Sequence, residues 1–157
     1  MNMLRKSLGL LMGRRPAAMQ VGALCLQAGS DRVLLITSRD TGRWIIPKGW
    51  PMAGRTLYGA AALEAWEEAG VRGHVGRHEI GRYSYDKRQD SGYGVPVEVR
   101  VFPFHVTGLA DDFPEAAQRS RRWFDAAAAA DLVAEPGLKS LLLQLPAIGI
   151  LRGGPSQ

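Results

Sequence analysis

The pattern of apolar and polar positions predicts strands at the start of the chain, one amphipathic helix in the middle, and further strands and helices after it. Apolar runs and alternating positions mark the strands, and helical spacing marks the helices. This order favours an α/β architecture with a mixed sheet between helices. The expected strands are 17–27, 32–37, 75–85 and 97–106, and the expected helices are 56–69, 126–132 and 138–145.

Several local signals refine this outline. Pro103 inside the last strand predicts an edge position or a bulge, because proline cannot donate to a ladder. Asp125 is an expected N-cap for the helix that follows it. The pair Pro136-Gly137 is expected to break the chain before the final helix. Loops are expected at 86–96, which is Gly-rich and charged, and at 108–118.

The length of 157 residues favours one domain with a core of its own, expected at 17–146. Residues 1–16 are basic and contain no acid, so they are expected to form a flexible segment, and 147–157 a tail. The chain contains one cysteine, Cys25, which indicates a buried side chain in a reducing compartment, and we expect the cytoplasm. No apolar run reaches the roughly 18 residues of a membrane span. A monomer or a homodimer is expected.

A net charge of +5 favours a polyanionic ligand, namely polyphosphate, a nucleotide or RNA. The alternative is that the charge serves solubility alone. No nucleic-acid-binding motif is found in the sequence, so RNA is the less favoured partner.

The central helix carries three glutamates on one edge. Glu64, Glu67 and Glu68 fall within an arc of roughly 100° when each residue turns the helix by about 100°. The opposite side is apolar and mostly small. Thr56 is the expected N-cap, and Gly70 is expected to end the helix.

These acids are poorly placed for a helix that is only structural. They lie in its last two turns, where the helix dipole disfavours negative charge. Glu64 is three residues from Glu67 and four from Glu68, and like charges at these spacings repel. The segment 56–69 contains no Lys or Arg. A hard divalent cation such as Mg²⁺ or Mn²⁺, which prefers oxygen ligands, would relieve this repulsion, whereas the plainer alternative is a solvated helix face.

The stretch from Gly49 to Val71 resembles the signature of the Nudix hydrolases, G-x5-E-x7-R-E-U-x-E-E-x-G-U, where U is aliphatic. Two positions depart from the pattern: Arg55 replaces a glutamate and Leu63 replaces an arginine that positions the neighbouring carboxylates. The matching positions are Gly49, Glu64, Ala65, Glu67, Glu68, Gly70 and Val71.

Outside this signature, the chain is similar to the diphosphoinositol polyphosphate phosphohydrolase branch of the family. The shared features are the W-x-x-P-K-G entry at 44–49, the Gly-Arg-Tyr start at 81–83, and the F-P-E…R-x-R-x-W-F segment at 113–124. The resemblance implies a Nudix α/β/α sandwich with a mixed central sheet.

The resemblance also implies a metal site and an activity. Glu64, Glu68 and the backbone carbonyl of Lys48 would hold Mg²⁺ or Mn²⁺, and Glu67 would be the general base. Family members differ in which acid is the base, so Glu67 also counts among the metal ligands and Glu64 among the catalytic acids. The implied reaction is hydrolysis of a phosphoanhydride in a polyphosphorylated small molecule.

Basic side chains supply candidates for phosphate binding, because arginine binds phosphate oxygens in a bidentate manner. By resemblance, Ser38 and Arg39 contact the substrate. The alternative for Arg39 is ordinary loop charge. Arg88 and Arg121 are further candidates for the distal phosphates, and the alternative for Arg88 is that its loop only connects two strands. Glu98 is a less favoured fourth carboxylate.

Three functions remain open at this point. The first is an active hydrolase of diphosphoinositol or dinucleoside polyphosphates. The second is a related enzyme that removes the 5′ pyrophosphate of RNA. The third is a nucleotide-binding module that has lost turnover, motivated by Leu63 and Arg55. Retention of all three acids favours the enzyme over the binding module.

Overall fold

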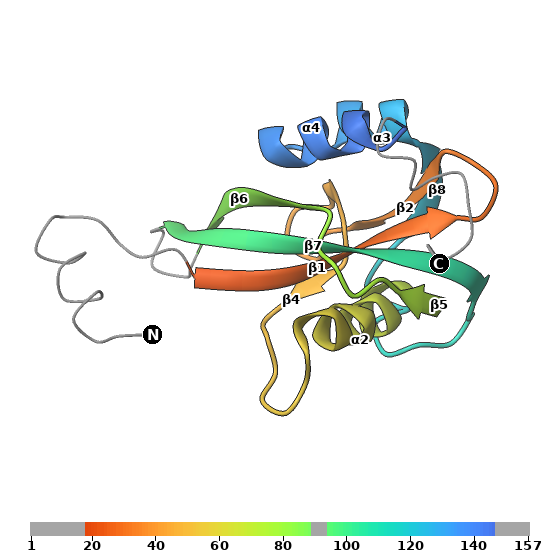
Figure 1. Ribbon diagram of the computed structural model, residues 1–157, viewed down its shortest axis with the longest axis horizontal. Coiled ribbons are helices and arrows are strands. Elements are labelled where there is room, and N and C mark those ends of the chain that lie inside the picture. The colour runs from red at the N-terminus through yellow and green to blue at the C-terminus, as the bar shows by residue number, and fades with distance from the viewer. Residues whose placement is uncertain (1–17, 89–93, 147–157) are drawn as a thin grey trace, which may run out of the picture.

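The computed structural model describes residues 18–88 and 94–146, and within them one eight-stranded sheet lies between helices (Figure 1). The segments 1–16 and 147–157, which were expected to be flexible, lie outside the described residues. The strands are β1 (Ala18–Gln27), β2 (Arg32–Thr37), β3 (Trp44–Ile45), β4 (Lys48–Gly49), β5 (Val71–Val75), β6 (Gly81–Arg88), β7 (Gly94–Leu109) and β8 (Arg121–Asp125), and the helices are α2 (Leu57–Ala69), α3 (Ala126–Leu132) and α4 (Pro136–Gln144).

The sheet is mixed. Its main path runs β3-β2-β1-β7-β5, with β4 paired to β1, β6 to β7 and β8 to β2. Strands β1 and β7 are parallel over ten residue pairs, and the other pairings are antiparallel. Because β1 is the centre of the sheet, its residues 20–26 are all buried, which explains why its sequence is nearly continuously apolar.

Helices cover both faces of the sheet (Figure 1). On one face α3 and α4 bury a core of large aliphatic side chains, including Leu24, Leu138 and Leu142. On the other face α2 packs with the small residues Ala61 and Ala65 against the sheet. Small side chains allow α2 to lie close to the strands, which brings its acidic edge near the backbone of β4. The expected α/β/α sandwich is confirmed.

The ends of α2 are as predicted. The Thr56 side chain accepts a hydrogen bond from the backbone N–H of Gly59 at 3.1 Å and caps the first turn. Gly70 adopts the left-handed conformation with φ 66°, and its N–H donates to the Trp66 carbonyl at 2.9 Å. Both ends are therefore set by local chemistry.

The prediction of a single strand at 75–85 is wrong. The structure has two strands, β5 and β6, with residues 76–80 between them. Both pair with β7, β5 near its C-terminal end and β6 near its N-terminal end. The long partner β7 decides this division, because it offers pairing positions to two successive short strands.

Strand β7 also corrects two further expectations. The loop expected at 86–96 is shorter, because residues 86–88 pair with 94–96; residues 89–93 lie outside the described part of the chain. The strand is interior rather than an edge, although it contains Pro103. The Pro103 carbonyl accepts a hydrogen bond from the Gly76 N–H at 2.7 Å, so it points to the gap between β5 and β6. The N and C=O of one strand residue point to the same side, so the absence of an N–H at Pro103 costs no hydrogen bond to β1.

The C-terminal part differs in three details. The segment 119–122, to which no strand was assigned, contributes Arg121 and Arg122 to strand β8, paired with β2. Asp125 stands at the N-cap of α3, but its side chain makes no capping hydrogen bond and lies 3.5 Å from Arg32. Pro136 begins α4 instead of breaking the chain, because a first-turn position of a helix needs no N–H donor.

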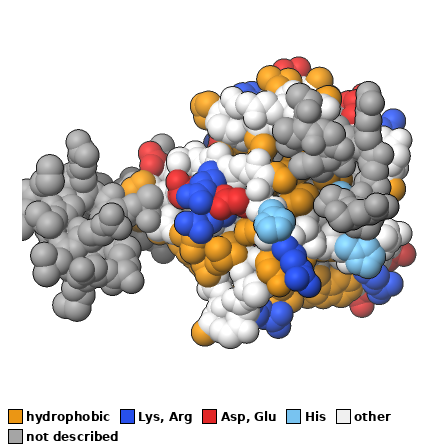
Figure 2. Space-filling model, viewed as in Figure 1, with side chains coloured by type: hydrophobic (Ala, Val, Ile, Leu, Met, Phe, Trp, Pro, Cys, Tyr) orange, Lys and Arg blue, Asp and Glu red, His pale blue; other side chains and the backbone are white. Residues whose placement is uncertain are grey.

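The surface mixes charge and apolar groups. On the face drawn in Figure 2, basic side chains are interspersed with acidic, histidine and hydrophobic ones. Within the described residues, none of the helices has the length and apolar character needed to cross a membrane.

Candidate active site

Strand β4 and helix α2 meet at two carboxylates. The backbone N–H of Lys48 donates to Glu68 Oε1 at 3.1 Å. Gly49 lies against Glu64 so closely that a Cβ at this position would overlap the carboxylate carbon of Glu64. Glu64 and Glu68 are only 9% and 8% exposed. The Pro-Lys-Gly loop and the acidic helix edge, which are far apart in sequence, therefore form one site.

Burial and mutual repulsion disfavour ionisation of Glu64. Its pKa is raised to about 7, first by burial and then by the negative charges of Glu68, Glu67 and Glu115. Burial also raises the pKa of Glu68, but the Arg119 guanidinium and the Lys48 N–H oppose that rise. The sequence predicted a negative cluster without compensation, whereas in the structure Arg119 and the Lys48 N–H compensate it in part.

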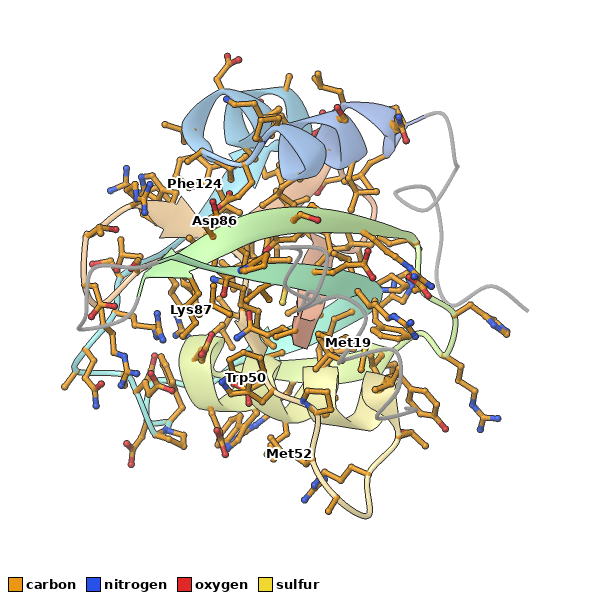
Figure 3. The ribbon with its side chains drawn as sticks, turned by 90° about the vertical axis from the view of Figure 1, so that its left-hand side faces the viewer. Met19, Trp50, Met52, Asp86, Lys87 and Phe124 are labelled. Carbon is orange, nitrogen blue, oxygen red and sulfur yellow. The ribbon has the colours of Figure 1, made fainter. Side chains whose placement is uncertain are left out.

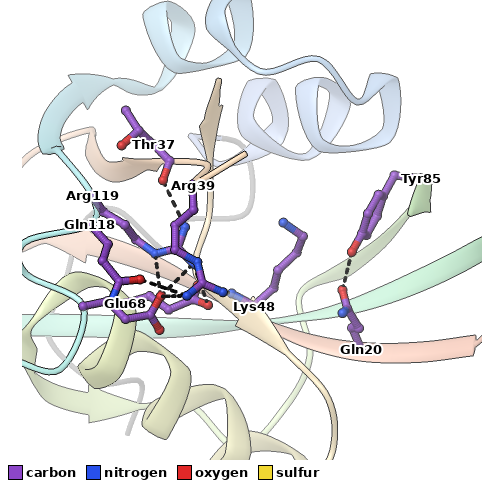
Figure 4. A network of polar contacts seen from close by, with 9 residues as sticks. Gln20, Thr37, Arg39, Lys48, Glu68, Tyr85, Gln118 and Arg119 are labelled. Atoms are coloured by element: carbon purple, nitrogen blue, oxygen red, sulfur yellow. Dashed lines mark hydrogen bonds and ion pairs between the residues drawn. The ribbon is translucent and has the colours of Figure 1, made fainter. Parts of the chain in front are cut away.

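A guanidinium that the sequence analysis did not single out lies on this cluster (Figure 4). Arg119 Nη2 donates to Glu68 Oε2 at 3.2 Å and lies 3.0 Å from Glu115 Oε1. Arg119 Nη1 donates to the Thr37 carbonyl at 3.0 Å. The sequence signal was the basic run at 119–122, but the run alone did not say which arginine faces the acids.

The fourth carboxylate of the cluster is Glu115. Its backbone N–H donates to the Glu67 carbonyl at 3.0 Å, which places the segment before β8 against the last turn of α2. Glu98, the residue considered for this role, lies elsewhere: it pairs with Arg82 at 3.4 Å. Glu115 belongs to the F-P-E segment noted in the sequence, so that motif was the available signal.

Arg39 reaches the cluster from the loop after β2. Its Nη1 donates to Gln118 Oε1 at 2.9 Å and lies 3.5 Å from Glu115 Oε1, and its side chain is 55% exposed. The backbone of the neighbouring Ser38 closes the hairpin loop, with its N–H on the Arg43 carbonyl at 2.7 Å. This guanidinium is partly exposed beside a buried acidic cluster, and its contact with a phosphate group stays a prediction.

The other two arginines differ from Arg39. Arg121 Nη1 donates to the Ala69 carbonyl at 2.7 Å, and its guanidinium lies over the Phe113 ring, 4.9 Å from the centroid. It therefore satisfies the end of α2, and its contact with substrate stays a prediction. Arg88 ends β6, and its side chain lies outside the described part of the structure.

The described residues fit a hard cation bound in part by substrate. Among residues 18–88 and 94–146, no three His, Cys, Asp or Glu side chains converge to hold a metal by themselves. Mg²⁺ needs only one or two protein carboxylates when waters and phosphates supply the rest. Glu64 and Glu68 meet that need. The Glu64 carboxylate occupies the space that a Cβ at Gly49 would fill.

An aromatic surface borders this site. Trp50, next to Gly49 in the chain, is 45% exposed, and Lys87 Nζ lies 5.8 Å from the centroid of its ring (Figure 3). The sequence analysis did not assign Trp50 a role. A half-exposed indole beside a lysine offers a flat apolar face with a positive charge at its border.

The raised pKa of Glu64 predicts a pH-dependent stability in metal-free protein. Between the ordinary value of 4.5 and about 7, the folded state holds more protons at Glu64 than the unfolded chain, so raising the pH lowers the free energy of unfolding. Glu64→Gln, which mimics the protonated acid, should match wild type near pH 4.5 and exceed its Tm by roughly 5–10 °C at pH 7.5.

Thermal unfolding in EDTA across this range measures the difference. Adding Mg²⁺ at pH 7.5 should raise the Tm of wild type and not that of Glu64→Gln, because a ligand selective for the folded state stabilises it. Parallel pH profiles of the two proteins would show that Glu64 ionises normally.

Comparisons with known proteins identify the family of this domain. Residues 16–145 match the family model of the NUDIX domain. Diphosphoinositol polyphosphate phosphohydrolase 3-alpha of Mus musculus is 36% identical over 115 residues, which cover 69% of this chain and 66% of that protein. Diphosphoinositol polyphosphate phosphohydrolase 2 of Rattus norvegicus is 33% identical over 109 residues, covering 67% and 56%. The matched region thus spans just under two thirds, or less, of these curated relatives.

Solved structures show the same fold at low sequence identity. A Caenorhabditis elegans Ap4A hydrolase superposes with a TM-score of 0.59 at 20% identity, covering 85% of this chain and 98% of its own. The Escherichia coli dihydroneopterin triphosphate pyrophosphohydrolase superposes with a TM-score of 0.64 at 16% identity, covering 82% and 97%. Because the family model matches most of this chain, the chain belongs to the Nudix domain family.

Proposed function

We propose that this protein is a divalent-metal-dependent hydrolase that cleaves a phosphoanhydride bond in a polyphosphorylated small molecule. The observation that carries the proposal is the buried Glu64–Glu68 pair, held against β4 with the exposed Arg39 at its border. Retaining repelling, buried carboxylates is costly unless a cation is bound there. The curated relatives, which are named as phosphohydrolases, support the same class of reaction.

Each group of the site has a distinct role in this proposal. Glu64, Glu68 and the Lys48 carbonyl would hold Mg²⁺ or Mn²⁺, and the ion would supply charge neutralisation and a more acidic water. Glu67, on the same helix edge, would be the general base that accepts a proton from water. Arg39 and Ser38 hold the distal phosphates, with Arg88 and Arg121 as further candidates. Catalysis of this kind consists mainly of positioning and charge neutralisation.

Two substrate classes are favoured by different observations. The relatives are named for diphosphoinositol polyphosphates, which makes that class the first candidate. The exposed Trp50 with Lys87 beside it favours the second, a dinucleoside polyphosphate, because an indole face stacks on a nucleobase. An inositol ring has no π face to stack, so stacking of the substrate on Trp50 would favour the dinucleoside class.

We further propose that the protein acts in the cytoplasm. Cys25 is the only cysteine and is buried, and burial raises the pKa of its thiol to about 12, so it stays protonated and unreactive. RNA is a less favoured substrate, although the net charge of +5 suits it. Basic groups are scattered rather than gathered on the face that Figure 2 draws.

A hydrolysis screen tests the proposal. The panel holds diphosphoinositol polyphosphates, diadenosine polyphosphates, nucleoside triphosphates, nucleotide sugars and 5′-triphosphorylated RNA, each with Mg²⁺ and with Mn²⁺. Turnover of one class by wild type, dependent on the metal, would support the proposal and select the substrate. Silence across the panel with metal bound would favour a binding module instead.

A further inference from the structure

Arg119 holds one side of Glu68 while the backbone holds the other. Lys48 N donates to Oε1 of Glu68 at 3.1 Å, and Arg119 Nη2 donates to Oε2 at 3.2 Å. A carboxylate held at both oxygens has a fixed rotamer, whereas one held at a single oxygen can rotate about its last bond. Both bonds to the carboxylate are charge-assisted, and in the one from Arg119 the donor is charged as well.

Arg119 is itself fixed by the protein. Its side chain is 6% exposed, and it contacts the Thr37 carbonyl on β2 and the Glu115 carboxylate in its own segment, as Figure 4 shows for the contact with Thr37. A guanidinium with its fork fully engaged and little exposed is pre-organised rather than free to follow a ligand. Arg39, by contrast, is 55% exposed, so the two arginines on Glu115 have different roles.

The sequence of α2 explains why this contact matters. Residues 57–69 contain three glutamates and no Lys or Arg. The uncharged Leu63 side chain, one residue before Glu64, offers these acids no positive charge. Any guanidinium on these carboxylates must therefore come from elsewhere in the fold. The segment between β7 and β8 supplies it, because pairing of β8 with β2 places Arg119 beside the end of β2.

We propose that Arg119 is the positioning residue of Glu68, and that it supplies through the tertiary structure the guanidinium that helix α2 lacks. Arg119 keeps the Glu68 carboxylate aimed at the site in the absence of metal. The effect on turnover rests on the proposed hydrolase function, whereas the coupling between Arg119 and Glu68 does not.

The first test measures that coupling in EDTA, without metal or substrate. Thermal unfolding is compared for wild type, Arg119→Met, Glu68→Met and the double variant. Arg119→Met should lower the Tm of wild type by roughly 4–8 °C, since hydrogen bonds to charged groups are strong. In the Glu68→Met background the loss should be less than half as large. Equal losses in both backgrounds would overturn the proposal.

The second test measures turnover, with Arg122→Met as matched control. Arg122 is a neighbouring exposed arginine whose guanidinium lies over the Trp44 ring and not on the acids. Arg119→Met should lower kcat by about 10- to 100-fold, because a misplacement of about 1 Å at a reacting group has effects of that size. Its KM should stay close to that of wild type. Arg119→Lys, which keeps the charge without the fork, should recover at least about threefold over Arg119→Met.

The outcomes separate the two proposals. Turnover of Arg119→Met equal to that of the Arg122→Met control would overturn the positioning role. A wild-type protein silent on every substrate would overturn the hydrolase function and leave the metal-free coupling as the test of Arg119. If Arg119→Met does not fold, Arg119→Lys carries both comparisons, with smaller expected effects in the same directions.

Discussion

Glu68→Gln is expected to lower turnover of the proposed substrate by about 1,000-fold, the largest effect of any single change considered for this protein. A bound metal ion supplies several kcal/mol of transition-state stabilisation, and each ~1.4 kcal/mol lost is tenfold in rate. Glu68 is the residue on which the Lys48 backbone, the Arg119 guanidinium and the acidic edge of α2 converge. The amide keeps the shape and a hydrogen-bonding oxygen but removes the charge that a cation requires.

The measurement is kcat and KM with Mg²⁺, together with Mn²⁺ binding followed by electron paramagnetic resonance. Glu79→Gln is the matched control, since Glu79 is also a carboxylate bonded to an arginine, 2.7 Å from Arg82, but lies away from the cluster. We expect it to behave as wild type. A Glu68→Gln protein that keeps normal turnover and Mn²⁺ affinity would remove Glu68 from the site.

Gly49→Ala should lower turnover by about 100-fold, the usual scale for displacing a catalytic group by about 1 Å. A Cβ at this position would overlap the Glu64 carboxylate, whose oxygen Oε2 would lie only 2.7 Å away. The backbone of Gly49 is in β4 and shows no positive φ, so alanine brings no backbone strain. The expected loss therefore comes from displacement of Glu64 alone.

Gly108→Ala is the control for this substitution. Gly108 also lies in a strand, and a Cβ there would meet no atom within 4 Å. Metal-free thermal unfolding should show both variants folded, and turnover should separate them. Equal turnover of Gly49→Ala and Gly108→Ala would mean that Glu64 can move without loss, which would contradict its role as a metal ligand.

The sequence was sufficient for the features that arise within one local element. Helix α2 has its expected bounds because Thr56, Gly70 and the spacing of small apolar residues act within a few turns. The acidic edge of Glu64, Glu67 and Glu68 follows from helical geometry alone. The mixed sheet between helices was also predictable, because the order of apolar runs limits the layers that can bury them.

Features that depend on a partner strand were not predictable in this way. The division of 75–85 into two strands and the interior place of Pro103 are both decided by β7, which pairs with β1 along one side and with β5 and β6 along the other. A local pattern shows that a segment can form a strand. It does not show which neighbour offers the hydrogen bonds or where that neighbour ends.

The residues of the candidate site also fall into those that the sequence identified and those that only the structure identified. The sequence by itself determined the three helical acids and the Gly49 loop that belongs with them, since their spacing fits a known signature. Only the tertiary structure decided that Glu115 and Arg119 complete the cluster, and that Arg121, two residues further on, instead caps α2. The physical reason is that electrostatic partners are chosen by proximity in space, and β8 pairing with β2 sets that proximity across some fifty residues of chain.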